Sequence, residues 1–475
     1  MLRAVGFGDG DFDKPIVGVA NGHSTMNPCN AGIQPLVDRA MSALEQAGAK
    51  PQVFGVPTVT DGIGMGTEAM KYSLVSREVI ADAIETSVNG QAMDGVLVVG
   101  GCDKNMPGGV MAMARMNVPA IYVYGGTIKP GKWKGKDLTI VSAFEAVGSF
   151  TAGKMSEDDF QGIEKNACPS VGACGGMYTA NTMSSSFEAL GVSLLGSSQM
   201  AAPDSEKADS SAESARVLVE AIKKESQAAR HHYPQVDRER DRARAWQPAA
   251  RPTRCCTISR SPPPRGVKWT IDDFERVRRK VPVLCDLKPS GRYVAVDFHR
   301  AGGAPQVLKI LLENGVLHGD VHDHPRQDHG RDAEGRARRA AQGPGRDPPV
   351  VEAASTRTAT SRSCAAISPP RAACAKITGL KNPVITGPAR VFDSENDCMK
   401  AIMAKRDQAG RRARHPLRRA EGRARHAGDA RADLGAHRPG PRRIGRPAHR
   451  RALLRRHLGH GGRPRRAGGL YVGVA

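Results

Sequence analysis

Three short segments of the chain combine residue types that can bind a metal ion. The first, residues 101–108, places a thiol, a carboxylate and an amine at the consecutive positions Cys102, Asp103 and Lys104. A thiolate suits iron or zinc, a carboxylate suits magnesium, and a buried lysine can lose its proton and react. An ordinary strand-to-helix turn with a buried cysteine and a surface ion pair gives the same pattern, so this segment alone does not decide between the two.

The second segment, residues 60–66, is rich in glycine and offers Asp61 as another carboxylate ligand. Its glycines would let the backbone approach a ligand, although for this segment alone a glycine-rich turn with Asp61 as a helix cap is the better explanation. The segment is not a dinucleotide-binding fingerprint, and the sequence contains no phosphate-binding loop of the form GxxxxGK[ST].

The third segment contains Cys168 and Cys174, whose C-x5-C spacing is that of neither a zinc pair nor a thioredoxin motif. At most one of the two is expected to point into a site shared with Cys102. Cys29 follows the first apolar run and could reach the same crevice. A lone cysteine is more often a small buried hydrophobic residue than a ligand, so none of these thiols is decisive alone.

The elements that must position these residues alternate between strand and helix. Apolar runs predict strands at 15–20, 52–60, 95–99 and 119–124, and helical spacing predicts helices at 33–48, at 77–89 and from about Pro107. After Thr139 the pattern is helical, with a cap at Ser156 and helices at 176–190, 206–224 and around 306–315. This order predicts an α/β fold, a doubly wound domain with added helices. Its ligand site should lie outside the carboxyl ends of the strands.

The charge of the chain is divided unevenly. Residues 1–224 contain 18 Lys and Arg against 24 Asp and Glu, whereas the remaining residues contain 52 against 24, and the whole chain has a net charge of +22. Residues 411–475 contain 19 Arg and no Lys. A natural basic tail usually mixes the two, whereas Arg, Ala, Gly, Pro and His are the residues that GC-rich codons give when translated out of frame. We therefore hypothesise frameshifts, with bounds near 225, 265, 320, 375 and 406.

These bounds define the predicted domain organisation. An N-terminal α/β domain occupies 1–320, with 225–265 out of frame. Residues 321–374 form a second out-of-frame segment, and 375–405 are a fragment, or remnant, of a C-terminal β-rich domain. Residues 406–475 are Arg-rich and either out of frame or disordered.

The bulk composition excludes several classes of protein. Ten cysteines in 475 residues are not a disulfide scaffold, and no apolar stretch resembles a signal peptide or approaches the ~18 residues of a membrane span. We therefore expect a cytoplasmic protein with reduced thiols and no membrane partner. The net charge suggests nucleic acid as an alternative partner. Residues 411–475 hold one aromatic residue, Tyr471, which argues against base stacking.

Five of the motifs together resemble one family. GGCDKNMPG, TVTDGIGMG, SREVIADAIE, NACPSVGACGGMYTANTM and GGTIKPG are similar to the motifs of the dihydroxy-acid and sugar-acid dehydratases. The resemblance covers 1–224, 266–320 and 375–405, about two thirds of the 475 residues. The sequences of the motifs TVTDGIGMG and GGTIKPG favour the dihydroxy-acid branch, and a sugar-acid (aldonate) dehydratase is the nearest alternative.

The resemblance implies a hydro-lyase that converts 2,3-dihydroxy-3-methyl acids to 2-keto acids in valine and isoleucine biosynthesis. It also implies a homodimer, a [2Fe–2S] cluster and Mg²⁺. Cys29, Cys102 and Cys174 match the cluster ligands, and Cys168 matches a position that is not a ligand. Asp61, Asp103 and Lys104 match the magnesium ligands, with Lys104 binding through a carbamate on its side-chain nitrogen.

The sequence departs from the family in three places. From the resemblance we expect the family's first 25–35 residues (roughly, by ordinary domain anatomy) to be missing. TRCCTISR stands near 240–260 where a segment of Gly, Ser, Thr and Asn is expected. The Arg-rich run after 406 replaces the part that should supply a glutamate for magnesium and the serine that acts as the base. The chain is therefore expected to hold half an active site and to lack turnover.

Overall fold

The computed structural model describes the N-terminal half of the chain almost completely. The described residues are 1–116, 118–223, 281, 284–317, 361–365, 372–376, 389–403, 412–414 and 470–471.

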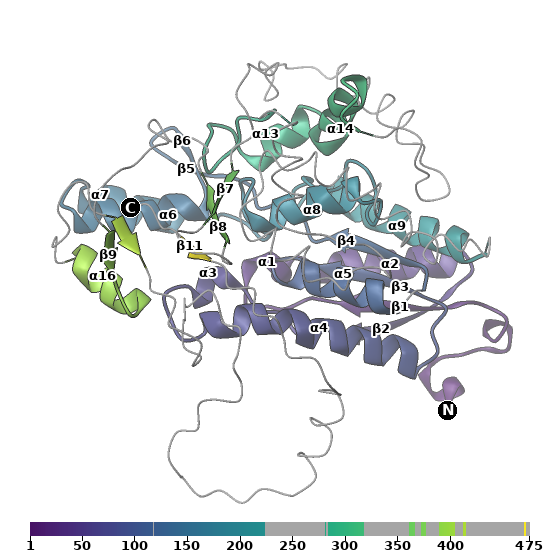
Figure 1. Cartoon of the computed structure of the whole chain (residues 1–475). Coiled ribbons are helices and arrows are strands. Elements are labelled where there is room, and N and C mark those ends of the chain that lie inside the picture. The colour runs from purple at the N-terminus through teal and green to yellow at the C-terminus, as the bar shows by residue number, and fades with distance from the viewer. Residues whose placement is uncertain are drawn as a thin grey trace, which may run out of the picture.

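A four-stranded parallel sheet forms the centre of the molecule (Figure 1). Its strands are β1 (Ile16–Asn21), β2 (Lys50–Gly55), β3 (Gly95–Gly100) and β4 (Ala120–Tyr124), in the order β2-β1-β3-β4. Every residue of β3 is buried, as expected for an inner strand of a parallel sheet. The four predicted strands are confirmed. The second ends at Gly55 rather than at residue 60, and Pro57, which has no N–H, cannot continue a ladder.

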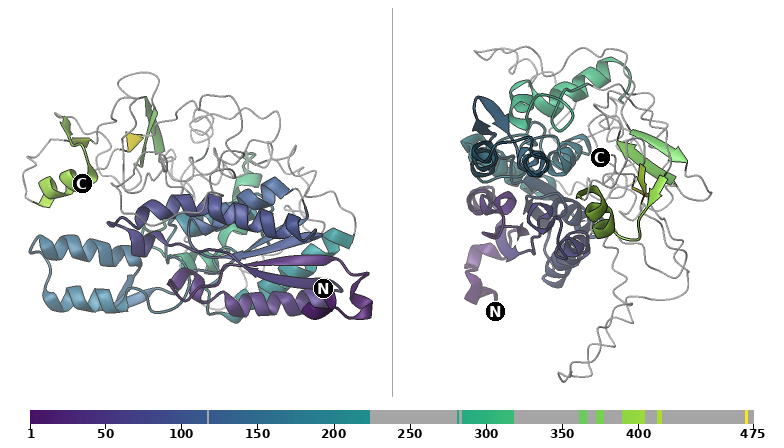
Figure 2. Two further views of the ribbon diagram at one scale, coloured as in Figure 1. Left: turned by 90° about the horizontal axis from the view of Figure 1, so that it is seen from below. Right: turned by 90° about the vertical axis from the view of Figure 1, so that its left-hand side faces the viewer.

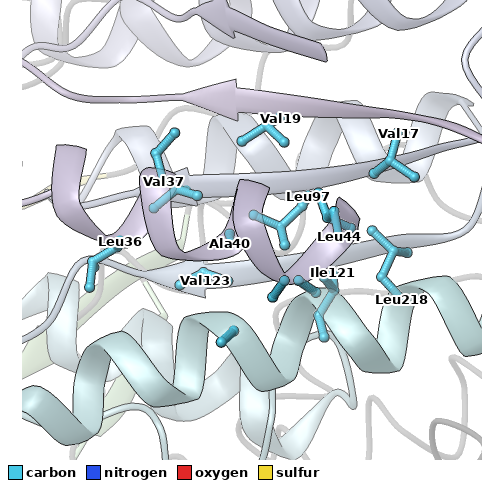
Figure 3. Packing of buried hydrophobic residues seen from close by; sticks show 14 of the residues in the cluster. Val17, Val19, Leu36, Val37, Ala40, Leu44, Leu97, Ile121, Val123 and Leu218 are labelled. Carbon is cyan, nitrogen blue, oxygen red and sulfur yellow. The ribbon is translucent and has the colours of Figure 1, made fainter. Parts of the chain in front are cut away.

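Helices cover both faces of this sheet, which confirms the doubly wound α/β fold. On one face, α2 (Gln34–Gln46) packs beside α9 (Ser205–Lys223), and on the other, α4 (Met70–Gly90) packs beside α5 (Asn105–Met116). Figure 3 shows the first of these cores, in which alternate strand residues meet apolar residues of α2 and α9. Its labelled members are Val17, Val19, Leu97, Ile121 and Val123 from the strands, Leu36, Val37, Ala40 and Leu44 from α2, and Leu218 from α9.

Further helices extend this domain. The helices α6 (Ile140–Thr151) and α7 (Glu157–Asn166) reach beyond the sheet (Figure 2) and pack through stacked Phe150 and Phe160 rings 4.7 Å apart. The Ser156 hydroxyl accepts from the Asp159 N–H at 3.2 Å, so the predicted cap of α7 is confirmed. A third core joins α8 (Thr179–Ala189) to α13 (Ala295–Arg300) and α14 (Gly303–Glu313).

The remaining elements are short. They include a hairpin of β5 (Gly131–Trp133) and β6 (Lys136–Leu138), which the sequence analysis missed because three-residue strands are too short to show alternation. The others are η1 (Leu2–Val5), η2 (Asp9–Asp11), α1 (Pro28–Ala31), α3 (Asp61–Gly64), β7 (Ser361–Ala365), β8 (Ala372–Lys376), β9 (Ala389–Val391), α16 (Glu395–Met403), β10 (Arg412–Arg414) and β11 (Leu470–Tyr471). Within the described part of the chain, no helix has the length and apolar composition that crossing a membrane requires.

Most of the segments predicted to be out of frame lie outside the described residues. This is true of all of 225–265, of 321–374 apart from β7 and the start of β8, and of 406–475 apart from β10 and β11. Their reading frame therefore stays a prediction, as does the assignment of 375–405 to a β-rich domain.

A buried lysine lies where α9 begins. Lys207 is fully buried, and its ammonium group donates to the Ser197 carbonyl at 3.0 Å and lies 5.7 Å from the centre of the Tyr124 ring. Burial lowers the pKa of Lys207 to about 8, although the charges of Glu188 and Glu206 act in the opposite direction. The folded state therefore binds fewer protons than the unfolded state between pH 8 and the ordinary lysine pKa of 10.5.

This lysine should make stability depend on pH. The free energy of unfolding should rise as the pH increases from 8 towards 10.5, because the unfolded chain still binds the proton there. Relative to Lys207→Met, the wild-type chain should gain roughly 2–4 kcal/mol across this range, measured by urea unfolding. The same substitution at the exposed Lys165 should leave the pH profile unchanged. Parallel profiles for wild type and Lys207→Met would contradict the prediction.

Candidate active site

Two of the predicted segments, 60–66 and 101–108, meet Cys29 at the carboxyl ends of the strands. Cys29 lies in α1 after β1, Asp61 begins α3 after β2, and Cys102 follows β3. Since the strand order is β2-β1-β3, the chain leaves β1 towards one edge to form β2 and returns on the other side to form β3. Such a switch point leaves a crevice between the loops after β1 and β3, where doubly wound proteins bind ligands.

A tight backbone contact joins the loop after β1 to the loop after β3. A side chain on Gly101 would overlap the carbonyl oxygen of Cys29, so only glycine fits there. The next residue, Cys102, has a φ of 36°, a left-handed conformation that is costly for a residue with a side chain. The fold thus holds the Cys102 thiol in a strained turn directly beside the helix that carries Cys29.

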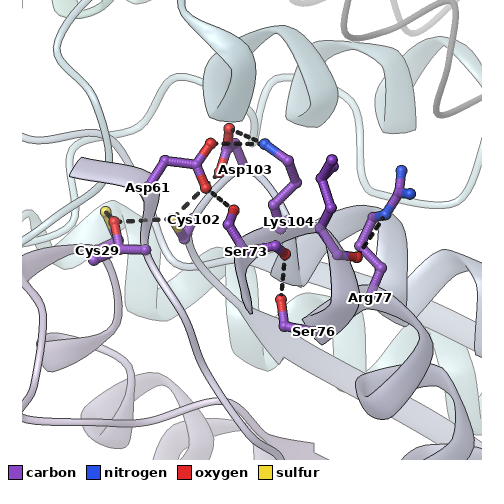
Figure 4. Close-up of polar contacts among 10 residues, drawn as sticks. Cys29, Asp61, Ser73, Ser76, Arg77, Cys102, Asp103 and Lys104 are labelled. Carbon is purple, nitrogen blue, oxygen red and sulfur yellow. Dashed lines mark hydrogen bonds and ion pairs between the residues drawn. The ribbon is translucent and has the colours of Figure 1, made fainter. Parts of the chain in front are cut away.

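A buried ion triad adjoins the cysteines (Figure 4). The ammonium group of Lys104 lies 2.7 Å from Asp61 Oδ2 and 2.8 Å from Asp103 Oδ2. The other oxygen of Asp61 accepts a hydrogen bond from the Ser73 hydroxyl of α4. The Lys104 side chain is 4 % exposed and those of its two partners 16 % and 12 %, so solvent screens these charges little.

The three charges shift one another's pKa values. Burial raises the pKa of Asp61 to about 6, and the charge of Asp103 adds to this effect. Burial also opposes the charged form of Asp103, but the Lys104 ammonium outweighs it and holds the pKa of that carboxyl below its ordinary value. The two carboxylates likewise overcome burial at Lys104 and raise its pKa. The triad therefore carries two anionic groups around one cation.

The thiols of Cys29 and Cys102 meet at one hydroxyl group. Cys102 Sγ donates to Thr60 Oγ1 at 3.2 Å, and Cys29 Sγ lies 3.9 Å from the same oxygen. Hydrogen bonding to Cys102 and burial raise the pKa of the Cys29 thiol, and the charges of Cys102 and Cys174 raise it further. The three predicted cysteines are thus close enough for their charges to interact.

The two cysteines of the C-x5-C segment differ in their exposure to solvent. Burial raises the pKa of Tyr124 well above its ordinary value, and the charges of Cys174, Cys29 and Cys102 each raise it further. Cys174 is half-buried and near enough to Cys29 for its charge to act on that thiol, whereas Cys168 is exposed to solvent.

The thiols and carboxylates of the site are residue types that suit the magnesium ion and the iron–sulfur cluster that the resemblance implies. Over the described residues, no three or more His, Cys, Asp or Glu side chains are arranged to hold a metal ion. Asp61 and Asp103 instead converge on the Lys104 ammonium, and a buried pair of carboxylates around one cation is the donor chemistry that Mg²⁺ prefers. The thiols of Cys29 and Cys102, which meet at one hydroxyl group, and the Cys174 thiol, whose charge acts on Cys29, likewise suit an iron–sulfur cluster. The residue types fit both groups.

The sequence analysis missed a buried polar network behind Cys174. Its centre is Asn181 in α8, which is fully buried and contacts Tyr124, Thr127 and the backbone of Cys174. The sequence offered little sign of it, because α8 reads TANTMSSSFEA and Asn181 is one of several polar residues in that helix.

Comparison with known proteins identifies the class of enzyme. Residues 14–234 and 257–329 match the family model for the N-terminal part of the dihydroxy-acid/6-phosphogluconate dehydratases. The chain therefore belongs to this family, and the assignment made from the motifs is confirmed. The unmatched residues between these ranges fall inside the segment 225–265 for which we hypothesise a shifted frame.

The curated relatives that resemble the chain are named as dihydroxy-acid dehydratases. The chain is 59 % identical over 413 residues to dihydroxy-acid dehydratase 1 of Cupriavidus pinatubonensis and to the dihydroxy-acid dehydratase of Herminiimonas arsenicoxydans. It is 58 % identical over 421 residues to the dihydroxy-acid dehydratase of Burkholderia thailandensis. Each match covers 86 % of this chain and 73 % of the relative.

The contact between Gly101 and Cys29 gives a test of the site's architecture. Gly101→Ala should lower the free energy of unfolding by on the order of 1–3 kcal/mol, since the added methyl group overlaps backbone that cannot rotate away. Urea unfolding measures the loss. Gly62→Ala is the matched control, because its methyl group would meet nothing closer than Thr60 Oγ1 at 3.8 Å. Equal stability of the two variants would show that the loops after β1 and β3 are not packed as described.

Proposed function

We propose that this chain carries the N-terminal half of the active site of a dihydroxy-acid dehydratase. Such a hydro-lyase removes water from 2,3-dihydroxy-3-methyl acids to give 2-keto acids, in valine and isoleucine biosynthesis. The observation that carries the proposal is the meeting of two thiols with a buried carboxylate pair at one switch point of the sheet, with Cys174 near enough for its charge to act on Cys29. The names of the relatives support the same reaction.

The proposed cofactors are a [2Fe–2S] cluster and Mg²⁺. Cys29, Cys102 and Cys174 would hold the cluster, and Asp61 and Asp103 would hold the magnesium together with Lys104 as a carbamate. When bound, these groups would supply Lewis acids for the departing C3 hydroxyl and for the charge that develops on the carboxylate and C2 hydroxyl.

The protein's own groups would position the substrate and the cofactors. The Ser73 hydroxyl donates to one oxygen of Asp61, and the other oxygen of Asp61 faces the Lys104 ammonium group. Thr60 lies between two of the thiols and fixes their directions. Because the carboxylates are buried, their attraction for a cation and for a substrate bound to it is stronger than it would be in water.

The catalytic base is the part that we propose this chain lacks. In the family, the base is a serine of the C-terminal domain, and that domain also supplies a glutamate for magnesium. Residues 406–475 have the composition of a shifted frame, and no residue there matches either role. We therefore propose that the 475-residue chain can assemble the N-terminal half-site but does not complete the reaction.

Cysteine substitutions test the proposed cluster. After anaerobic reconstitution with iron and sulfide, Cys29→Ser, Cys102→Ser and Cys174→Ser should each lose most of the bound iron, because each removes one of three thiolates. Iron and sulfide assays, together with visible absorption, measure the loss. Cys168→Ser serves as the control and should keep the wild-type iron content. Iron lost only from Cys168→Ser, or from none of the variants, would contradict the ligand set.

Turnover tests the proposed defect. The 475-residue chain should give no detectable 2-keto acid from 2,3-dihydroxyisovalerate, whereas a chain restored to one reading frame across 225–475 should gain at least about a thousandfold, since a base and a metal ligand return together. An aldonate assayed in parallel would show whether the restored enzyme belongs to the sugar-acid branch. Normal turnover by the 475-residue chain would refute the proposed defect.

A further inference from the structure

We propose that Asn181 is a positioning residue that holds the loop of Cys174 against the end of β4, and thereby fixes the third thiol of the site. The inference rests on the proposed function in one respect, since it takes Cys174 to be a ligand of the cluster. The hydrogen bonds that support it lie entirely within the protein.

The amide nitrogen of Asn181 faces the loop that follows Cys174. It donates to the carbonyl oxygen of Cys174, to that of Gly176 at 2.8 Å and to the Thr127 hydroxyl at 3.1 Å. One side chain therefore ties both ends of the turn that carries the thiol. Asn181 is fully buried, so water does not compete for these bonds.

The amide oxygen of Asn181 faces the opposite way, towards the sheet. It accepts from the hydroxyl of Tyr124, the last residue of β4, at 2.8 Å. This bond fixes which way the amide points, because the flipped amide would direct its oxygen at two carbonyl groups. The ammonium group of Lys207 lies over the Tyr124 ring, 5.7 Å from its centre.

Thr127 completes the attachment of the loop. Its hydroxyl accepts from Asn181 and donates to the Cys174 carbonyl at 2.8 Å, so that carbonyl receives two hydrogen bonds. Beside it, the Ala173 N–H donates to Gly126 at 2.9 Å, and the Ile128 N–H donates to Ala173 at 2.6 Å. The loop of Cys174 is thus joined to the segment after β4 by backbone and side-chain bonds together.

The presence of an asparagine at position 181 supports the positioning role. A buried amide is costly unless its hydrogen bonds are satisfied, and an apolar side chain would fill the same buried position at no such cost. The side-chain bonds of Asn181 all go to the Cys174 loop or to the two residues that hold it, Tyr124 and Thr127. Groups that orient a metal ligand in this way typically change metal affinity about 10- to 100-fold when they are removed.

The test uses the full chain with Asn181→Asp, which keeps the shape of the side chain but replaces both N–H donors by an acceptor. Two readouts are needed. In the metal-free chain, the rate of alkylation of Cys174 relative to Cys29, followed by mass spectrometry, should rise about tenfold. In the reconstituted chain, iron should dissociate to a chelator about 10- to 100-fold faster, and the reduction potential of the cluster should shift.

Two further variants separate positioning from stability. Tyr124→Phe removes only the bond that orients the amide and should cause a smaller change in the same direction. Ser186→Ala is the control, because this buried hydroxyl of the same helix donates only to the Thr182 carbonyl, at 2.6 Å. It should change neither readout. If Asn181→Asp does not fold, Tyr124→Phe decides the question.

The outcomes distinguish this inference from the proposed function. Unchanged alkylation of Cys174 in Asn181→Asp or Tyr124→Phe would overturn the inference whether or not a cluster forms. Faster alkylation in a chain whose wild type binds no iron would support the positioning role and refute the proposed cluster. Equal changes in Ser186→Ala would show that any lost hydrogen bond in α8 acts in this way, and would also overturn the inference.

Discussion

The close packing of Gly101 against the Cys29 carbonyl is the contact on which the candidate site depends. It brings the loop after β3 into contact with the helix after β1, at the point where the strand order β2-β1-β3 opens the sheet. Because no side chain intervenes, two thiols reach the same threonine hydroxyl, and the ion triad follows one residue later. Any side chain at position 101 would separate these groups.

Electrostatics then divides the site into two parts with different chemistry. Around Lys104, two carboxylates and one cation leave an excess of negative charge that suits a divalent cation. Beside Thr60, two thiols meet at one hydroxyl group, and hydrogen bonding to Cys102 together with burial disfavours the charged form of Cys29. A positively charged cofactor that binds all three thiolates would relieve this cost, which gives a physical reason for cysteine at each position.

The fold was largely predictable because its signals are local. Apolar runs marked all four strands, and Ser156 marked the start of α7. The prediction was less accurate where buried residues are polar. The helix α4 begins at Met70 rather than at residue 77, because Ser73 and Ser76 are buried in its first turns and give no apolar pattern. The C-x5-C spacing could not say which cysteine is exposed, and two bonds of Asn181 join residues more than fifty positions apart, which no local pattern encodes.

Mössbauer spectroscopy of the 475-residue chain reconstituted with ⁵⁷Fe tests the central claim most directly. Three cysteines around a two-iron cluster leave one iron with two protein thiolates and the other with only one and an open position. The account therefore predicts two inequivalent iron sites, one of which responds to added dihydroxy acid. A single class of iron with four sulfur ligands, or no cluster iron at all, would contradict the claim that Cys29, Cys102 and Cys174 form a three-thiolate site at the switch point of the sheet.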